Sequence, residues 1–228
     1  MTPTSTATLA ARDWAEIQER MLVPLYEAVY DRLEVGPGDR LLGLDCGAGL
    51  ALLLAAARGA AATGVEADPA RRALARERLL EVLPAPPAAP SPLRPYDVLL
   101  ALSPTPAALA SALPAVRRGG AVVLADWGPA ERCTVPSVLG GGPVPVDLDA
   151  VVERAGLRPD GSGRVFCPFG YADVDSAVRG LVSTGLYDGA SDAALAEKEL
   201  AEALHPFERP DGTVWLPNIF RYVIARVA

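Results

Sequence analysis

The residues with the clearest chemical potential are a glycine-rich turn, Cys46-Gly47-Ala48-Gly49, and an acid further along the chain, Glu66. Glycines let the backbone approach a ligand closely, and the helix that follows offers unpaired N–H groups at its N-terminus. A carboxylate at the tip of the next strand can accept hydrogen bonds from both hydroxyls of a ribose. Strand, glycine turn, helix, strand and acid form the βαβ plan of a nucleotide-type site, so this spacing predicts one here.

Other candidate residues have less specific surroundings. Ser103 follows an apolar run, where it either lines a pocket or caps the next helix. Cys46 is more typical of a small buried filler than of a nucleophile. His205 is the only histidine and would suit a general base, but it precedes a proline at a predicted helix end, where stabilising the helix terminus is the more typical role. No catalytic residue is therefore identified from the sequence.

Length and composition restrict the classes of protein. The 228 residues fit one α/β domain, the formal net charge is −7, and Lys198 is the only lysine. This charge speaks against binding to nucleic acid or to anionic membranes. Three cysteines without a CxxC pair, together with one histidine, speak against a metal site. No signal peptide or apolar run of 18 residues is seen, so a cytoplasmic location is expected.

Strands and helices alternate along the chain, which predicts a mostly parallel sheet with helices on both faces and an antiparallel last strand. Residues 1–11 are expected to be a frayed arm, and Pro24 is expected to be able to kink the first helix. The predicted strands start at Arg40 and span 61–66, 96–102, 121–127, 157–169 and 214–227. The predicted helices span 13–33, 50–58, 68–83, 106–116, 147–155, 174–183 and 191–204.

The order of these segments resembles the class I S-adenosylmethionine-dependent methyltransferases, specifically the small-molecule branch of secondary metabolism. The resemblance covers residues 12–226 and rests on RLLGLDCGAG, GVEAD, YDVLLALSP, RRGGAVVLADWG and the C-terminal run from FGYADVDSAVRG to IFRYVIARV. It implies a Rossmann-like fold with strand order 3-2-1-4-5-7-6, or the same sheet lacking strand 3. It also implies S-adenosyl-L-methionine as cofactor and a small molecule as methyl acceptor.

The resemblance assigns expected roles to particular positions. It treats the chain as a single domain, with residues 1–35 as a helical cap and 170–205 as a helical insertion before the last strand. Its substrate candidates are Trp14, Tyr26, Trp127, Tyr171 and Arg179. Its cofactor-binding candidates are Gly43, Asp45, Cys46, Gly47, Ala48, Gly49, Glu66, Ala67 and Ser103.

The chain departs from the family pattern in two places. Gly43 stands where the family has an aspartate, and Asp45 stands where it has the first glycine; a carboxylate there would either attract the positive sulfonium or collide with the ligand. The stretch 84–95 holds six prolines and no acid where the family has its third strand and adenine-binding loop.

A second hypothesis follows, in which cofactor use is lost or altered. The protein would then be a non-methylating enzyme such as a cyclase, or a partner subunit of an active methyltransferase; a homodimer is also possible. A dinucleotide site is disfavoured because the third glycine is missing.

Overall fold

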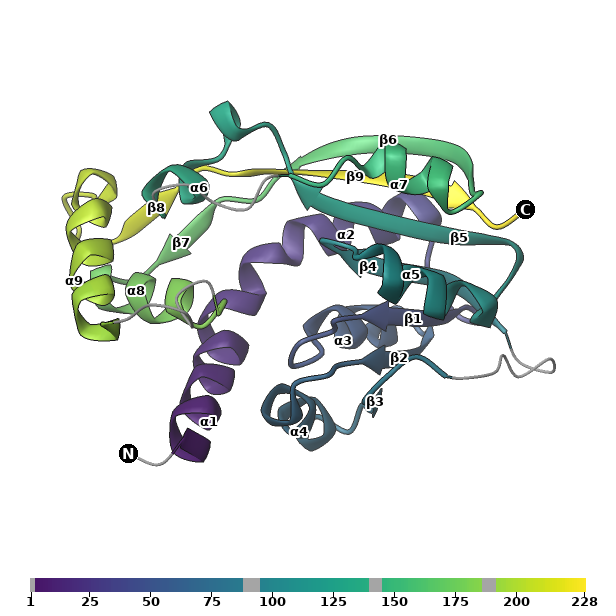
Figure 1. Cartoon of the computed structure of the whole chain (residues 1–228), viewed down its shortest axis with the longest axis horizontal. Helices are drawn as coiled ribbons and strands as arrows, with labels where there is room; N and C mark the ends of the chain where they lie inside the picture. The colour runs from purple at the N-terminus through teal and green to yellow at the C-terminus, as the bar shows by residue number, and fades with distance from the viewer. Residues whose placement is uncertain (1–2, 88–94, 140–144, 186–191) are drawn as a thin grey trace.

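A central sheet organises the computed structural model, which describes residues 3–87, 95–139, 145–185 and 192–228 (Figure 1). Within these residues seven strands form one sheet in the order β3-β2-β1-β4-β5-β9-β6. The pairs from β3 to β5 are parallel, and β9 runs antiparallel to β5 and to β6. This confirms the predicted order 3-2-1-4-5-7-6. The strands are β1 (Arg40–Leu44), β2 (Ala61–Val65), β3 (Glu81–Leu83), β4 (Tyr96–Leu102), β5 (Val116–Trp127), β6 (Arg158–Phe166) and β9 (Ile219–Arg226).

The third strand is present, so the alternative of a sheet lacking strand 3 is wrong. Helix α4 (Pro69–Glu77) ends earlier than predicted, and Leu79 adopts a left-handed conformation with φ of 63°. The N–H of Leu80 bonds back to the carbonyl of Ala75 at 3.2 Å, which closes the helix end. The chain then pairs with β2 over the three residues of β3. Within the proline tract, residues 88–94 lie outside the described residues.

Helices cover both faces of the sheet, and each face has its own hydrophobic core. On one face lie α2 (Val23–Leu33), α3 (Leu50–Ala57) and α4, where the buried Tyr30 hydroxyl donates to the carbonyl of Ala51 at 2.9 Å. On the other face lie α5 (Pro106–Ala112) and α7 (Leu148–Arg154). Asp68, Thr105 and Asp147 cap the N-termini of α4, α5 and α7 through their side chains, as is typical of these residue types.

The N-terminal region is helical throughout its described part, so the expected frayed arm is wrong for residues 3–11. Helix α1 (Pro3–Asp13) packs against α4 and α8 (Val174–Val182), which supplies the tertiary contacts that a short isolated helix lacks. Between α1 and α2 lies an irregular segment, residues 14–22, made of a π-helix (Trp14–Gln18) and a 3₁₀-helix (Glu19–Leu22). The predicted regular helix 13–33 is therefore interrupted before Pro24.

A second, two-stranded sheet accompanies α6 (Thr134–Val138), α8 and α9 (Ala193–Leu204) at one end of the main sheet (Figure 1). It pairs β7 (Phe169–Tyr171) with β8 (Val214–Leu216) in antiparallel fashion. The predicted strands 157–169 and 214–227 each split in two. The breaks lie opposite one another, where the N–H of Cys167 bonds to the carbonyl of Asn218 at 2.9 Å.

Candidate functional site

The glycine turn lies between the carboxyl end of β1 and the start of α3. Asp45, Gly47 and Gly49 all have positive φ, at 46°, 59° and 91°. Aspartate is among the few residue types that tolerate this backbone region, so Asp45 can stand where the family has glycine. Its side chain is exposed, whereas Cys46, Gly47, Ala48 and Gly49 are buried.

Glu66 reaches the glycine turn from the end of β2, but both of its oxygens are engaged by backbone amides. Oε2 accepts from the N–H of Gly47 at 2.8 Å, and Oε1 accepts from the N–H of Asp68 at 2.8 Å. The residue is 5% exposed. Its carboxylate therefore holds the turn against the start of α4 in this conformation.

A second carboxylate, that of Glu19, closes the turn from the irregular segment. Its Oε1 accepts from the N–H of Leu50 in the first turn of α3 at 3.0 Å, and its Oε2 pairs with Arg78 at 3.0 Å. Arg78 also donates to the carbonyl of Ala48 at 2.8 Å. Glu19 is 2% exposed, and burial raises its pKa despite the bonds from Leu50 and Arg78. These contacts form a complete binding site for a carboxylate, occupied by the chain itself.

Trp14 covers the turn beside Glu19. A Cβ placed on Gly47 would come within 2.5 Å of the indole Nε1 of Trp14 and within 3.2 Å of Oε1 of Glu19. Glycine is therefore needed here to admit the chain's own side chains. The guanidinium of Arg71 lies 4.4 Å from the centroid of the Trp14 ring and donates to the carbonyl of Ser183 at 2.7 Å.

The close approach of α3 to the sheet explains the missing aspartate at Gly43. A Cβ on this buried glycine would lie 3.0 Å from Cδ2 of Leu52. Its partner across β1 and β2 is Gly64, where a Cβ would meet Sγ of Cys46 at 2.5 Å and Leu52 at 2.7 Å. The two glycines thus leave room for Leu52 and Cys46 above the sheet, and Cys46 fills space, as its residue type suggested.

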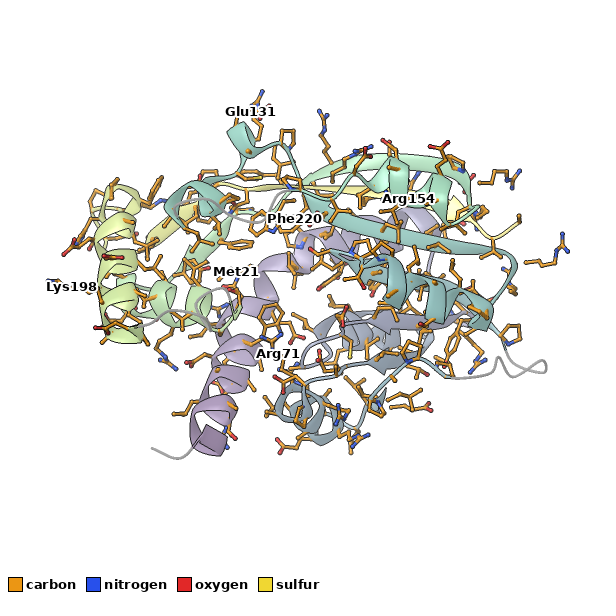
Figure 2. All side chains as sticks on the ribbon, viewed as in Figure 1. Met21, Arg71, Glu131, Arg154, Lys198 and Phe220 are labelled. Carbon is orange, nitrogen blue, oxygen red and sulfur yellow. The ribbon has the colours of Figure 1, made fainter. Side chains whose placement is uncertain are left out.

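A cavity of about 220 Å³ lies beside the carboxyl ends of β4 and β5, beneath the irregular segment. Most of its wall is apolar, and the centroid of the Trp127 ring lies 4.6 Å from that of the tilted Phe220 ring and 5.8 Å from that of Phe169. Figure 2 labels Phe220, on β9, and Arg71, on α4 beside the N-terminal helices, both near the middle of the view. The wall is formed by Trp14, Gln18, Leu22, Arg71, Leu102, Ser103, Trp127, Val135, Phe169, Leu181, Thr184 and Phe220.

Ser103 supplies a polar group to this cavity. It follows β4 with φ of 46°, a left-handed conformation that is rare for serine and that marks local strain. Its hydroxyl donates to Oδ1 of Asp126 at 2.7 Å, and its N–H donates to the carbonyl of Ala125. Asp126 is 2% exposed and also accepts from the N–H of Val146. The oxygen of Ser103 is therefore held as a hydrogen-bond acceptor at the cavity wall.

The structure brings three of the predicted site residues, Trp14, Ser103 and Trp127, together around this cavity. Tyr26 lies in the core at 7% exposure, and Ala67 is exposed. The hydroxyl of the buried Tyr171 donates to Oε1 of Gln18, a cavity residue, at 2.9 Å.

Arg179 forms an ion pair with Asp13 at the surface. Sequence reasoning missed Glu19 and Arg78, which hold the glycine turn closed, and Gln18 and Arg71 in the cavity wall. The only sequence signal for Glu19 is the run of three polar residues, 18–20, between the apolar Ile17 and Met21.

Two further classes of site are not found in the part of the chain that the structure describes. No group of three or more His, Cys, Asp and Glu side chains there could hold a metal ion. No helix there is long and apolar enough to cross a membrane.

Comparisons with known proteins identify the fold. No protein-family model matches the sequence, and no curated protein matches it. Among solved structures, the [4+2]-cyclase SpnF has a TM-score of 0.56 at 18% identity, over 89% of this chain and 80% of that one. A methyltransferase from Thiobacillus denitrificans, in complex with S-adenosyl-L-homocysteine, has a TM-score of 0.53 at 17% identity, over 99% of both chains. One from Geobacter sulfurreducens, in complex with the same molecule, has a TM-score of 0.50 at 19% identity, over 92% of both chains.

These similarities confirm the predicted fold class, the Rossmann-like fold of class I S-adenosylmethionine-dependent methyltransferases. The same fold is shared by proteins that transfer methyl groups and by one whose name is that of a cyclase. The fold therefore leaves the reaction to be argued from the side chains of the site.

Proposed function

We propose that this protein is an S-adenosylmethionine-dependent methyltransferase that acts on a small, largely apolar molecule. The observation that carries this proposal is the pairing of two sites at one sheet edge. One is the carboxylate-binding site of Leu50 and Arg78, and the other is the aromatic cavity at the ends of β4 and β5. Ligands of open α/β sheets bind outside the carboxyl ends of the strands, where both sites lie. A role in secondary metabolism and a cytoplasmic location belong to the same proposal.

The donors at the glycine turn suit the carboxylate of the cofactor's methionine part. The N–H of Leu50 and the guanidinium of Arg78 already hold a carboxylate with hydrogen bonds of 3.0 Å. In this conformation, however, that place belongs to Glu19, and both oxygens of Glu66 accept backbone hydrogen bonds. Cofactor binding therefore requires residues 14–22 to move away from the turn.

In the cavity, the chain's own residues would orient the acceptor. When bound, the cofactor supplies a methyl group on a positively charged sulfur. The aromatic walls exclude water, and the Ser103 oxygen, whose proton is directed to Asp126, can accept a hydrogen bond from an acceptor hydroxyl. Positioning of this kind supplies much of the rate of a bimolecular transfer. In this proposal, the residues of the glycine turn bind the cofactor, whereas Ser103 orients the acceptor.

Isothermal titration calorimetry of the full chain with S-adenosyl-L-homocysteine tests the cofactor. Micromolar binding is expected, followed by mass-spectrometric detection of methyl transfer to members of a panel of small phenols. Ser103→Ala is expected to retain cofactor binding and to lose at least tenfold in transfer rate, on the scale of a lost hydrogen bond in a catalytic site. Absence of heat from folded protein at high concentration of both components would exclude the proposed cofactor.

A second candidate function is favoured by the closure of the glycine turn. If the contacts of Glu19, Glu66 and Trp14 are permanent, the protein keeps the fold without methyl transfer, as a non-methylating enzyme such as a cyclase or as a partner subunit. The similarity in fold to SpnF is compatible with this reading. Binding of small phenols without binding of S-adenosyl-L-homocysteine would favour the second candidate. Co-purification with a methyltransferase, or a stable homodimer in size-exclusion chromatography with light scattering, would identify the partner.

A further inference from the structure

The irregular segment 14–22 is where the N-terminal helical region meets the glycine turn. A π-helix followed directly by a 3₁₀-helix interrupts the regular helical hydrogen bonding between α1 and α2. Such interruptions inside helices commonly mark hinges or functional sites. Trp14 begins the π-helix and Glu19 begins the 3₁₀-helix, and both side chains contact the glycine turn. A change in this segment would therefore move both closing groups together.

The contacts that close the turn are of a kind that a ligand can replace. The Glu19 carboxylate is bound by one backbone N–H and one guanidinium, the same two donors that an incoming carboxylate would use. The residue is almost fully buried, so it gives up hydration to sit there. A soluble carboxylate that takes its place lets Glu19 return to water.

Trp14 shows that the closed arrangement is not fully satisfied. Its Nε1 is the buried side-chain polar atom without a hydrogen-bond partner among the residues that the structure describes. A buried donor that lacks an acceptor disfavours the conformation that contains it. The closed state therefore combines strong contacts at Glu19 with an unpaired donor at Trp14, as expected of a segment that also has an open arrangement.

We propose that Glu19 is a latch: its carboxylate occupies the place of the ligand's carboxylate between Leu50 and Arg78, and residues 14–22 open when the ligand displaces it. This inference rests on the proposed function, since it takes the ligand to be the carboxylate-bearing cofactor. The apparent affinity is the intrinsic affinity multiplied by the fraction of molecules that are open, so the closed state lowers it. Removing the charge of Glu19 should raise affinity, which is the opposite of what loss of a ligand-binding residue does.

The test compares Glu19→Gln with Glu16→Gln, a matched control in the same irregular segment whose side chain is exposed. Hydrogen–deuterium exchange reports on residues 14–22, and calorimetry measures the affinity for S-adenosyl-L-homocysteine. Glu19→Gln is expected to speed exchange in 14–22 and to raise affinity by about tenfold, as for a closed state favoured tenfold over the open state. The control should match the unmodified protein in both measurements.

Arg78→Gln is the more decisive variant, because the guanidinium binds the carboxylate of Glu19 in the closed state and would bind that of the ligand in the open state. It is expected to speed exchange in 14–22 like Glu19→Gln, but to lower affinity rather than raise it. If Glu19→Gln changes neither exchange nor affinity, or lowers affinity, Glu19 is only a helix cap and the proposal is overturned. Circular dichroism checks folding; if Glu19→Gln does not fold, Glu19→Asp, which keeps the charge on a shorter side chain, takes its place, with smaller changes in the same directions.

Failure of the proposed function has a separate signature. If no variant binds S-adenosyl-L-homocysteine, the cofactor assignment is wrong and hydrogen exchange alone decides the latch. Faster exchange of 14–22 in Glu19→Gln than in Glu16→Gln then supports a releasable segment. Equal exchange in the two variants overturns it.

Discussion

The two halves of the sheet's carboxyl edge are closed in different ways. At β1 and β2, the carboxylate of Glu66 accepts from the N–H of Gly47 in the glycine turn, and that of Glu19 accepts from the N–H of Leu50 at the start of α3 and pairs with Arg78. At β4 and β5, the side chains leave a cavity of about 220 Å³ with mostly apolar walls. One half is therefore filled by charged groups of the chain, whereas the other is left with space.

The two kinds of closure imply different ways of binding a ligand. A polar closure is opened by exchange, because an incoming carboxylate must displace one that is already bound, so affinity there is a difference between two similar sets of contacts. An apolar cavity has no such competitor, and a ligand that fills it gains dispersion contacts that its walls lack. Affinity at the β1/β2 half therefore depends on single charges, whereas affinity at the β4/β5 half depends on the shape of the ligand.

The largest expected effect comes from putting the family's acid back at Gly43. Gly43→Asp would place a buried carboxylate on the sheet face. Its Cβ alone would already lie 3.0 Å from Cδ2 of Leu52. Overpacking and an unpaired buried charge should together lower the free energy of unfolding by about 3 kcal/mol or more. Urea denaturation measures it, with Gly43→Ala as the control that adds only the Cβ, expected at about 1–2 kcal/mol. A loss below about 1 kcal/mol for the aspartate would mean that this half still accommodates the family pattern.

An intermediate effect is expected in the other half, at Ser103. Ser103→Ala removes the donor to Asp126 and leaves a buried carboxylate with one partner fewer, which should cost about 1–2 kcal/mol in thermal or urea unfolding. Ser103→Gly loses the same bond but suits the left-handed backbone, so it should be the more stable of the two by a few tenths to about 1 kcal/mol. Equal stability of the two variants would contradict the strain inferred from φ.

At neutral pH, the smallest effect on stability is expected at the Cys46 thiol under the glycine turn, because this thiol is protonated there in both the folded and the unfolded chain. Burial, with the nearby charges of Glu66 and Glu19 adding to it, raises the pKa of Cys46 from 9.0 to about 12. Alkylation by iodoacetamide at pH 9, in a Cys133→Ala/Cys167→Ala background, should be slower in the folded chain than in urea by on the order of a few hundred-fold.

The same pKa shift has a consequence for stability. Because the folded chain keeps the Cys46 proton to higher pH than the unfolded chain does, the stability contributed by this group is complete below about pH 9. It decreases as pH rises through 12. Rapid alkylation in the folded state would show that the β1/β2 half is open in solution.

Much of the fold could be predicted from local patterns, and the elements that could not be predicted have physical causes. The elements around the glycine turn and the whole of β4 follow from apolar runs bounded by glycine, proline and capping residues. β3 was missed because Leu79 occupies the left-handed position at the end of α4, where glycine would have signalled the helix end. The helix at 3–11 was missed because it depends on packing against α4 and α8 rather than on its own propensity.

The candidate site was predictable to a smaller extent. Trp14, Ser103 and Trp127 were candidates through the resemblance, in separate substrate and cofactor roles, and the structure brings them together around one cavity. The closing role of Glu19 could not, since a regular helix from 13 to 33 would give its side chain a different direction from that set by the π-helix and 3₁₀-helix. Its partner Arg78 is distant in sequence, so only the tertiary structure brings them together.

The position of Trp14 has one more consequence. Its ring forms part of the cavity wall, and its Nε1 edge lies against Gly47 in the turn. Occupants of the two places therefore share one side chain, and thermodynamic reciprocity requires each to change the affinity for the other by the same factor. A molecule in the cavity that fixes the indole in place would make the turn harder to open, so the two ligands would arrive in a preferred order.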